Sequence, residues 1–495
     1  MGRGPQPRAG APVNPVLRDY QQETLALVRK AAREGKRPIL VLPTGGGKTL
    51  TAVLGIVKPS ADKGARVLWI AHRAELIDQA AGAMRAAGLR VGEVMGDRAA
   101  DPEAPVQVAS IATLARRAGS LPDARVVIID EAHHVRSATY MATLAHYIAR
   151  KAIIIGMTAT PERLDGKGLG DVFDEIVEQV TVRELIEHGS LSQYRYYAPH
   201  VPDLTGIRRV GGDFSRRGSA DVMGKSEVVG NLVVQYQKHL AGQRALVFAV
   251  SIAHSLAVVA QFQEAGITAA HLDGTTPERE RAATLADFAA GRVLVVSNVD
   301  LFDEGFDCPA TAGVLIARPT QSLTKHRQMI GRALRPYLGK SHATILDHAG
   351  NFLRHGMPDD VLDWSLGDRT EPRETPKAKA CPKCYAIVPV HVAECPCCGH
   401  RFAVIRPRTG PEFKEGELGE VKQKVWTRAE KVALYAGLLR DAAAKGHMIG
   451  FARRKYREQT KVWPRGMAEL EAEARKNCDH WKLEAGRCRF CGCDC

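Results

Sequence analysis

The sequence lacks any apolar run that approaches the length of a membrane span, although 45% of its 495 residues are hydrophobic. Residues 1–15 are rich in Gly, Pro and Arg and lack the apolar stretch of a secretory signal peptide. These absences exclude the membrane-protein and secreted classes. We therefore expect a cytoplasmic protein that has no membrane partner and begins with a disordered segment, residues 1–15.

Cysteine is nearly absent from the first 380 residues, where Cys308 stands alone and is expected to be a small buried hydrophobe. The other ten of the 11 cysteines follow in closely spaced pairs, a pattern that favours zinc over disulfides in a reducing compartment. The spacing predicts one Zn²⁺ site formed by Cys381, Cys384, Cys395 and Cys398. A second cluster predicts another Zn²⁺ site, in which Cys493 or Cys495 could replace the histidine: Cys478, His480, Cys488 and Cys491.

Acidic residues are in the minority, with 55 Asp and Glu against 69 Lys and Arg, a net charge of +14. Residues 367–495 hold 26 of the basic and 17 of the acidic residues, so +9 of the excess lies in the last quarter of the chain. A basic excess is expected where phosphate backbones are bound, although it also occurs in proteins that merely stay dissolved. The same region lacks a convincing cluster of nuclease carboxylates, so any cleavage would need a partner.

Short β-branched runs alternate with helical segments, which predicts parallel strands covered by helices on both faces. The runs form two series, so we expect two α/β domains: 39–42, 67–70, 106–109, 126–129 and 153–155, then 245–249, 268–271, 293–296, 314–317 and 343–346. Residues 201–230 lie between the series and are expected to be a linker or insertion. After residue 366 the pattern breaks.

A phosphate-binding loop is predicted after the first run, at Thr44, Gly45, Gly46, Gly47, Lys48 and Thr49. The glycines let successive N–H groups face phosphate oxygens, Lys48 would reach the β- and γ-phosphates of ATP, and Thr49 would hold Mg²⁺. Asp130 ends a later strand and would bind the same Mg²⁺. Glu131 beside it would orient and deprotonate the attacking water.

With these residues in place, the chain resembles superfamily 2 helicases of the DEAH-box type, and among them RadD-like DNA repair helicases and the motor subunits of type III restriction enzymes. The segment Asp130-Glu131-Ala132-His133 resembles their second motif, and residues 328–335 (QMIGRALR) resemble their sixth. The resemblance covers about residues 16–366. It implies two tandem RecA-like parallel-sheet domains, which here precede small zinc-binding C-terminal modules.

The resemblance also implies roles for single residues. Adenine and phosphate contacts would come from Arg18, Gln21, Gly305 and Asp307, and catalytic arginines from Arg332 and Arg335 in the opposite lobe. Contacts to nucleic acid would come from Arg73, Thr113, Ser251 and Ser297. Coupling between the two sites would run through His133, Thr158, Thr160 and Gln328.

The expected domains follow from these motifs: helicase domain 1 (16–200), a linker or insertion (201–230), helicase domain 2 (231–366), a linker (367–380), a zinc ribbon (381–402), a basic and partly helical region (403–477) and a second zinc cluster (478–495). The expected function is an ATP-driven helicase or translocase on single-stranded or branched DNA, acting as a monomer in a bacterium or phage. Single-strand-binding or repair proteins are expected as partners. A restriction-complex motor, an RNA helicase and a non-catalytic DNA-binding scaffold remain alternatives.

Overall fold

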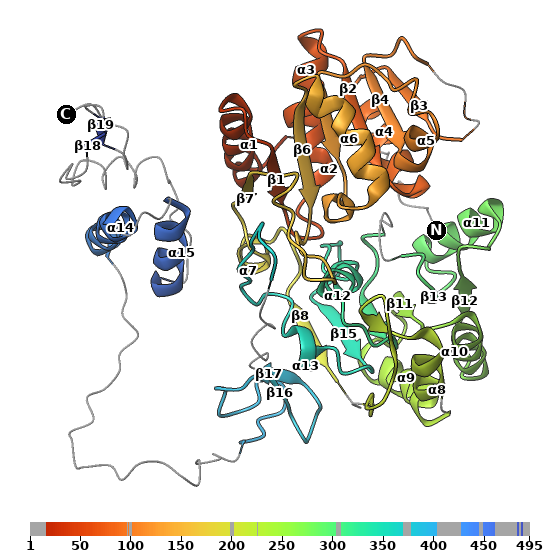
Figure 1. Cartoon of the computed structure of the whole chain (residues 1–495). Helices are drawn as coiled ribbons and strands as arrows, with labels where there is room; N and C mark the ends of the chain where they lie inside the picture. The colour runs from red at the N-terminus through yellow and green to blue at the C-terminus, as the bar shows by residue number, and fades with distance from the viewer. Residues whose placement is uncertain are drawn as a thin grey trace, which may run out of the picture. The chain divides into compact units, whose positions relative to one another are not determined.

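The computed structural model describes residues 16–96, 98, 101–198, 202–224, 226–302, 308–369, 378–402, 427–444, 449–460, 483–484 and 487–488. The chain divides into two compact units, residues 1–404 and 405–495. The first unit holds two α/β lobes, drawn in red to orange and in yellow to teal in Figure 1. Among the described residues, no helix is long and apolar enough to cross a membrane.

The first lobe contains a seven-stranded parallel sheet in the order β3-β4-β2-β5-β6-β1-β7. Its strands are β1 (Pro38–Val41), β2 (Val67–Ala71), β3 (Val91–Val94), β4 (Val106–Ser110), β5 (Val126–Ile129), β6 (Ile153–Thr158) and β7 (Glu175–Glu178). Its helices are α1 (Asp19–Arg33), α2 (Lys48–Ala52), a π-helical turn (Val53–Val57), α3 (Lys58–Asp62), α4 (Ala74–Ala86), α5 (Ile111–Arg116), a 3₁₀ turn (Ala132–His134), α6 (Ala138–Ala149) and α7 (Val182–Glu187).

Alternate residues of each strand in this sheet enter different cores, as the twofold periodicity of a strand requires. Leu40, Val67 and Trp69 pack against α1 and α4, whereas Ile39, Leu68 and Ile70 pack on the opposite face against α5 and α6. Both faces are therefore buried. The predicted parallel sheet with helices on both sides is confirmed for this lobe.

The second lobe contains a six-stranded parallel sheet in the order β12-β13-β11-β14-β15-β8. Its strands are β8 (Tyr194–Tyr197), β11 (Ala245–Phe248), β12 (Ala269–Leu272), β13 (Val295–Asn298), β14 (Gly313–Ile316) and β15 (Ala343–Asp347). A small hairpin, β9 (Arg209–Val210) and β10 (Asp213–Phe214), precedes its helices α8 (Arg216–Met223), α9 (Ser226–His239), α10 (Ile252–Glu264), α11 (Glu278–Ala289), α12 (Leu323–Gly331) and α13 (Phe352–His355).

The chain passes from the first sheet to the second at an earlier residue than the sequence suggested. The expected first domain runs to residue 200, but β8 pairs with β15 in the second sheet. The segment expected to be a linker or insertion, residues 201–230, contains the hairpin and α8, and α9 begins within it at Ser226. The boundary between the sheets therefore lies between β7 and β8.

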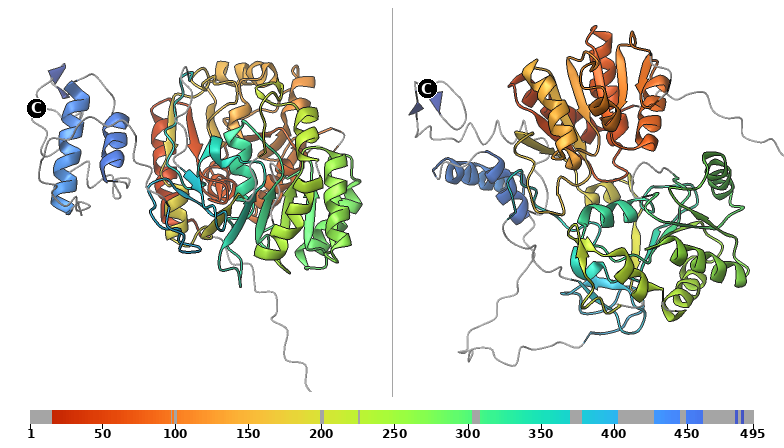
Figure 2. Two further views of the ribbon diagram at one scale, coloured as in Figure 1. Left: turned by 90° about the horizontal axis from the view of Figure 1, so that it is seen from below. Right: turned by 45° about the vertical axis from the view of Figure 1, so that its right-hand side comes forward.

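The first cysteine module is part of the second lobe's surface and core. It contains the antiparallel pair β16 (Ala378–Ala380) and β17 (Ile387–Pro389). Ala386 forms a bridge with Tyr197 at the edge strand β8, and the Ala198 N–H donates to the Tyr385 carbonyl at 3.0 Å. Val388 packs in the same core as Tyr197. The module therefore covers the open edge of the second sheet, as the right-hand view of Figure 2 shows.

The second unit is described at α14 (Arg428–Ala444), α15 (Ile449–Thr460) and the short strands β18 (Leu483–Glu484) and β19 (Arg487–Cys488). The two helices pack through Tyr435 and Tyr456, whose ring centroids lie 5.4 Å apart. Tyr456 lies in a run of basic and aromatic residues, 451–457, and its side chain is buried in the contact between the two helices.

Candidate functional site

The glycine-rich loop connects β1 to α2 and turns on two glycines with left-handed backbone angles, Gly45 (φ 87°) and Gly47 (φ 80°). Gly46 donates its N–H to the Pro43 carbonyl at 2.8 Å, which closes the turn. Lys48 begins α2, so the loop faces a helix N-terminus, which attracts phosphate groups. A Cβ on Gly47 would lie 2.6 Å from the Gln21 amide nitrogen, which leaves no room for a larger residue.

The two acids of the candidate site follow β5, at the carboxyl edge of the first sheet. Glu131 has a left-handed φ of 45°, and Asp130 accepts its N–H at 2.9 Å. The Lys48 ammonium lies 3.3 Å from one Glu131 oxygen, and His133 Nδ1 lies 3.4 Å from the other. The Lys48 and Glu131 side chains are only 14% and 9% exposed. The structure thus brings together the predicted phosphate lysine and the predicted base.

Hydrogen bonds join His133, which lies beside Glu131, to the end of β6. His133 Nδ1 lies 3.1 Å from the Thr158 hydroxyl, which donates to the Thr160 carbonyl at 3.1 Å. Arg163 NH1 donates to the His133 carbonyl at 3.2 Å, a contact that sequence reasoning did not name. The three residues predicted to couple the sites in this lobe, His133, Thr158 and Thr160, are therefore in contact.

A second histidine extends this arrangement. The His134 ring has its centroid 4.1 Å from that of His133 and 4.4 Å from that of His72. His72 directly precedes Arg73, the predicted nucleic-acid contact. The sequence alone indicated no role for His134. The fold shows that its ring lies between the ring of His133 and that of His72.

Residues before the first strand close the loop from the other side. Tyr20 and Gln21 both donate to the Gly46 carbonyl, at 3.0 and 3.2 Å. The Gln21 amide oxygen accepts the N–H of Arg18 at 2.9 Å. The predicted adenine segment is thus fixed to the phosphate loop. Tyr20 was not among the residues predicted to form the nucleotide site. Its position next to Gln21 in the sequence could have indicated this contact.

The second lobe brings α12 and the residues after it against the same loop. A Cβ on Gly331 would lie 2.4 Å from Thr44 Cγ2, and a Cβ on Gly45 would lie 3.7 Å from Arg335 Cγ. Arg332 Nε donates to the Phe302 carbonyl at 3.0 Å within the second lobe. Gln328 is 2% exposed, and its amide makes no hydrogen bond with a described residue. The Arg335 side chain therefore borders the loop.

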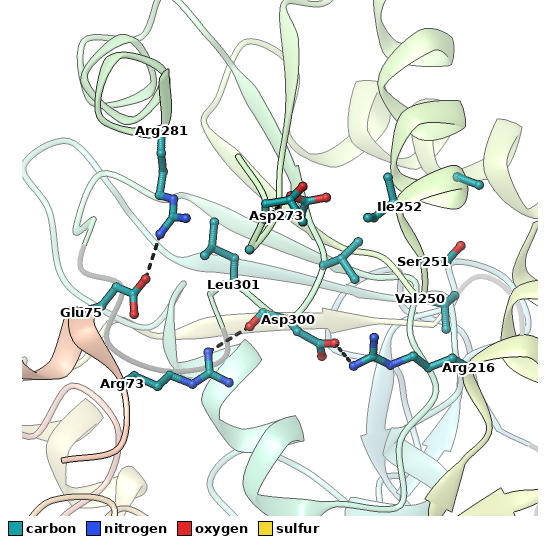
Figure 3. Close-up of a pocket in the computed structure, with 14 residues that line it drawn as sticks. Arg73, Glu75, Arg216, Val250, Ser251, Ile252, Asp273, Arg281, Asp300 and Leu301 are labelled. Atoms are coloured by element: carbon teal, nitrogen blue, oxygen red, sulfur yellow. Dashed lines mark hydrogen bonds and ion pairs between the residues drawn. The ribbon is translucent and has the colours of Figure 1, made fainter. Parts of the chain in front are cut away.

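A pocket of about 670 Å³ lies between the two lobes (Figure 3). The first lobe contributes Arg73 and Glu75, and the second contributes Arg216, Arg281 and Asp300, among others. Arg73 NH1 donates to the Asp300 carbonyl at 3.0 Å, and Arg281 pairs with Glu75 at 2.9 Å. These two contacts connect the lobes across the pocket.

The predicted nucleic-acid residues divide between this pocket and the core. Arg73 and Ser251 line the pocket. Thr113 is 4% exposed and its hydroxyl accepts the Gly96 N–H at 3.1 Å. Ser297 is fully buried and its hydroxyl lies 2.6 Å from that of Ser255. The hydroxyls of Thr113 and Ser297 therefore face the protein interior, and the structure does not bring them to the pocket.

The four cysteines of the ribbon converge. Their sulfur atoms all lie within 4.8 Å of one another, and the pairs Cys381–Cys398 and Cys384–Cys395 are each 3.6 Å apart. A tetrahedron with Zn–S bonds of about 2.3 Å has edges of about 3.8 Å, so this donor set fits zinc. Cys397 is exposed and stands outside the group.

Some predicted site residues lie outside the described residues: Gly305, Asp307, Cys478, His480 and Cys491. Cys488 is described only through its backbone, in β19. The second zinc cluster and the nucleotide contacts of Gly305 and Asp307 therefore stay predictions.

Comparison with known proteins agrees with this geometry. Residues 14–163 match the family described as the res subunit of type III restriction enzymes, and residues 224–337 match the helicase conserved C-terminal domain. A 51.5 kDa protein of a Lactococcus phage is 35% identical over 367 residues, which are 73% of this chain and 77% of that protein. The ATP-dependent helicase IRC3 of Saccharomyces cerevisiae is 31% identical over 68% of this chain and 52% of its own length.

Restriction enzymes supply further relatives. The EcoAI type I restriction endonuclease subunit of Escherichia coli is 25% identical over 72% of this chain and 49% of its own length. This chain thus spans about half the length of the yeast and Escherichia coli relatives. Among solved structures, a fragment of an HsdR subunit from Vibrio vulnificus has a TM-score of 0.52 at 19% identity, covering 69% of this chain and 67% of that one. The DNA-bound restriction-modification enzyme LlaBIII has a TM-score of 0.51 at 18% identity, covering 67% of this chain and 27% of that one.

The chain has two α/β lobes with parallel sheets. The first carries a phosphate loop, and the second places an arginine segment against that loop. This arrangement defines the class of ATP-hydrolysing motor proteins. Within that class, the chain belongs to the superfamily 2 helicases, in the group that includes the motor subunits of type III restriction enzymes.

Proposed function

We propose that the chain is a DNA translocase or helicase that moves along DNA as ATP hydrolysis closes and reopens the contact between its lobes. The observation that carries this proposal is the position of Arg335 and Gly331 of the second lobe against the phosphate loop of the first. A nucleotide bound there would touch both lobes, so its hydrolysis would change how they meet. The arginine-lined pocket between the lobes would respond to the same change.

Each catalytic group has a role that its neighbours support. Lys48 binds the β- and γ-phosphates, and Glu131 accepts a proton from the attacking water. Thr49 and Asp130 would hold Mg²⁺, which supplies charge neutralisation on the phosphates when bound. Arg332 and Arg335 stabilise the charge that develops on the γ-phosphate. Gln328, His133, Thr158 and Thr160 relay the state of this site to the pocket.

DNA is favoured over RNA as the nucleic acid along which the protein moves. One curated relative and two similar solved structures are restriction enzymes by name, and one of those structures is bound to DNA. The net charge of +14 suits a polyanionic partner. DNA repair, recombination or phage DNA metabolism is the proposed setting, and the phage relative supports the last of these. The restriction relatives also favour a second candidate, a motor that works within a larger nuclease complex.

The test of this function is ATP turnover in the presence of single-stranded, duplex and forked DNA and of RNA, with strand displacement measured on the forked substrate. We expect DNA to stimulate turnover at least tenfold and RNA to stimulate it less. Equal stimulation by RNA would favour an RNA helicase. Turnover that no nucleic acid changes would contradict the proposed motor.

We propose that the ribbon cysteines bind one Zn²⁺ and that the second cluster binds another. Metal analysis should find about two zinc ions per chain, and Cys381→Ser combined with Cys384→Ser should remove about one. Because Cys381 and Val388 pack in the same core as Tyr197, this variant should also unfold at a lower temperature. The control is Cys397→Ser, which changes an exposed thiol outside the group and should keep both zinc content and stability. A full chain without zinc, or a double variant that matches the control, would refute the ribbon site.

A further inference from the structure

The segment of residues 202–224, expected from its composition to be a linker or mobile insertion, has a defined fold. Its hairpin turns on Gly211 (φ 60°) and Gly212 (φ 87°), and two consecutive positive φ angles match the twist of a tight hairpin. Gly212 also approaches the first lobe, since a Cβ there would lie 3.1 Å from Leu164 Cγ. Leu164 follows the Thr158–Thr160 segment. We call residues 202–224 the strap.

The strand β10 of the strap holds the residues that precede α12. The Asp213 carboxylate accepts the Thr320 hydroxyl at 2.9 Å and the Gln321 N–H at 2.6 Å. The Arg354 guanidinium lies 5.3 Å from the centroid of the Phe214 ring. Thr320 and Gln321 directly precede Ser322, the N-cap of α12. A displacement of the strap would therefore move the helix that carries Gln328 and leads to Arg332 and Arg335.

The first residue of α8 in the strap reaches the pocket between the lobes. Arg216, three residues after Asp213, donates to Asp300 Oδ2 at 2.6 Å (Figure 3). Asp300 also binds Arg318 through its carboxylate and Arg73 through its carbonyl. Three guanidinium groups from three separate segments thus converge on one residue. The Arg216 side chain remains 71% exposed, so it borders the pocket where a ligand would enter.

Asp300 occupies the position that an anion would take in such a group. It adopts a left-handed φ of 55°, an uncommon conformation for a residue other than glycine. Burial raises the pKa of its carboxyl, but Arg318 and Arg216 outweigh that effect and hold the pKa below its ordinary value. The carboxylate therefore stays charged and neutralises the arginines. A phosphate group offers more acceptor oxygens than this one carboxylate and could compete for the exposed arginine.

We propose that Arg216 exchanges Asp300 for a backbone phosphate of the bound DNA strand, and that Asp213 transmits the resulting shift of the strap to α12. The inference rests on the proposed DNA motor and adds to it a strand contact and a coupling path that lie outside the shared helicase motifs. Arg216 binds the strand directly. Asp213 acts through α12 and is a positioning residue.

The test compares Arg216→Ala with Arg217→Ala, because both remove one positive charge from neighbouring positions of α8 and only Arg216 reaches the pocket. A single-stranded DNA oligonucleotide is titrated into an ATPase assay at several salt concentrations. We expect Arg216→Ala to raise the oligonucleotide concentration for half-maximal stimulation about tenfold and to lower the salt slope by about one. Arg217→Ala should match the parent protein.

The coupling step needs a different measurement, the maximal rate at saturating oligonucleotide. Asp213→Ala should lower that rate at least fivefold while the half-maximal concentration changes less than threefold. Thr320→Val removes only one of the two hydrogen bonds to Asp213 and should lower the maximal rate by a smaller factor. The Thr320 variant also gives a reading if Asp213→Ala fails to fold.

The outcomes separate this inference from the function on which it rests. A parent protein that no nucleic acid stimulates overturns both. A stimulated parent in which Arg216→Ala equals Arg217→Ala overturns the strand contact alone. The coupling is overturned if Thr320→Val keeps the full maximal rate and Asp213→Ala either keeps it as well or fails to fold.

Discussion

Replacement of Arg335 by Ala should leave ATP binding nearly intact and reduce ATP hydrolysis by about 10³-fold or more, as expected for an arginine that stabilises charge on a transferring phosphate. The groups that would hold the nucleotide, Lys48 and the glycine loop, belong to the first lobe. Arg335 belongs to the second, and its Cγ would lie 3.7 Å from a Cβ on Gly45. Binding and catalysis should therefore separate.

The measurement is nucleotide affinity by fluorescence or calorimetry, together with turnover at saturating ATP and DNA. Arg335→Lys is the informative second variant, because an ammonium keeps the charge but cannot reproduce the planar donor fork of a guanidinium. It should recover only a small part of the rate. The two-lobe assignment fails if Arg335→Ala abolishes ATP binding while turnover at saturation stays normal.

The arrangement of the lobes followed from the sequence because it depends on local patterns. Each run of β-branched residues became a strand of a parallel sheet, with strand ends that differ from the predicted ones by up to three residues. Lys48 and Glu131 follow β1 and β5, two strands that flank β6 in the sheet and are buried on both faces. Such strands are easy to recognise in a sequence, because the side chains on both faces are apolar and form a continuous apolar run.

The features that escaped prediction depend on contacts between distant parts of the chain. The strand β8, with the sequence Tyr-Arg-Tyr-Tyr, lies at a sheet edge, and nothing local indicates which sheet it joins. The strap contains enough glycine and arginine to resemble a linker, although Asp213 anchors its hairpin to the residues before α12 and Arg216 anchors the start of α8 to Asp300. Motif resemblance also assigned Ser297 to nucleic acid, whereas in the fold its hydroxyl faces Ser255.

Lys48→Ala and Glu131→Gln should both abolish ATP turnover, but they should change ATP affinity in opposite directions. In the structure the Lys48 ammonium lies 3.3 Å from Glu131, and both side chains are largely buried. An incoming γ-phosphate must therefore compete with the carboxylate for Lys48. Glu131→Gln removes that competitor and the general base together, so ATP should bind several-fold more tightly than in the parent.

Lys48→Ala removes the cation itself, so ATP affinity should fall by about tenfold or more while the carboxylate keeps its contact with His133 at 3.4 Å. Single-stranded DNA should still bind to both variants, because the pocket that carries Arg73 and Arg216 is formed by other residues. Stimulated turnover above a tenth of the parent rate in Glu131→Gln would exclude this carboxylate as the general base. Weaker ATP binding in Glu131→Gln than in the parent would show instead that the Lys48 to Glu131 pair prepares the site for ATP and does not compete with it.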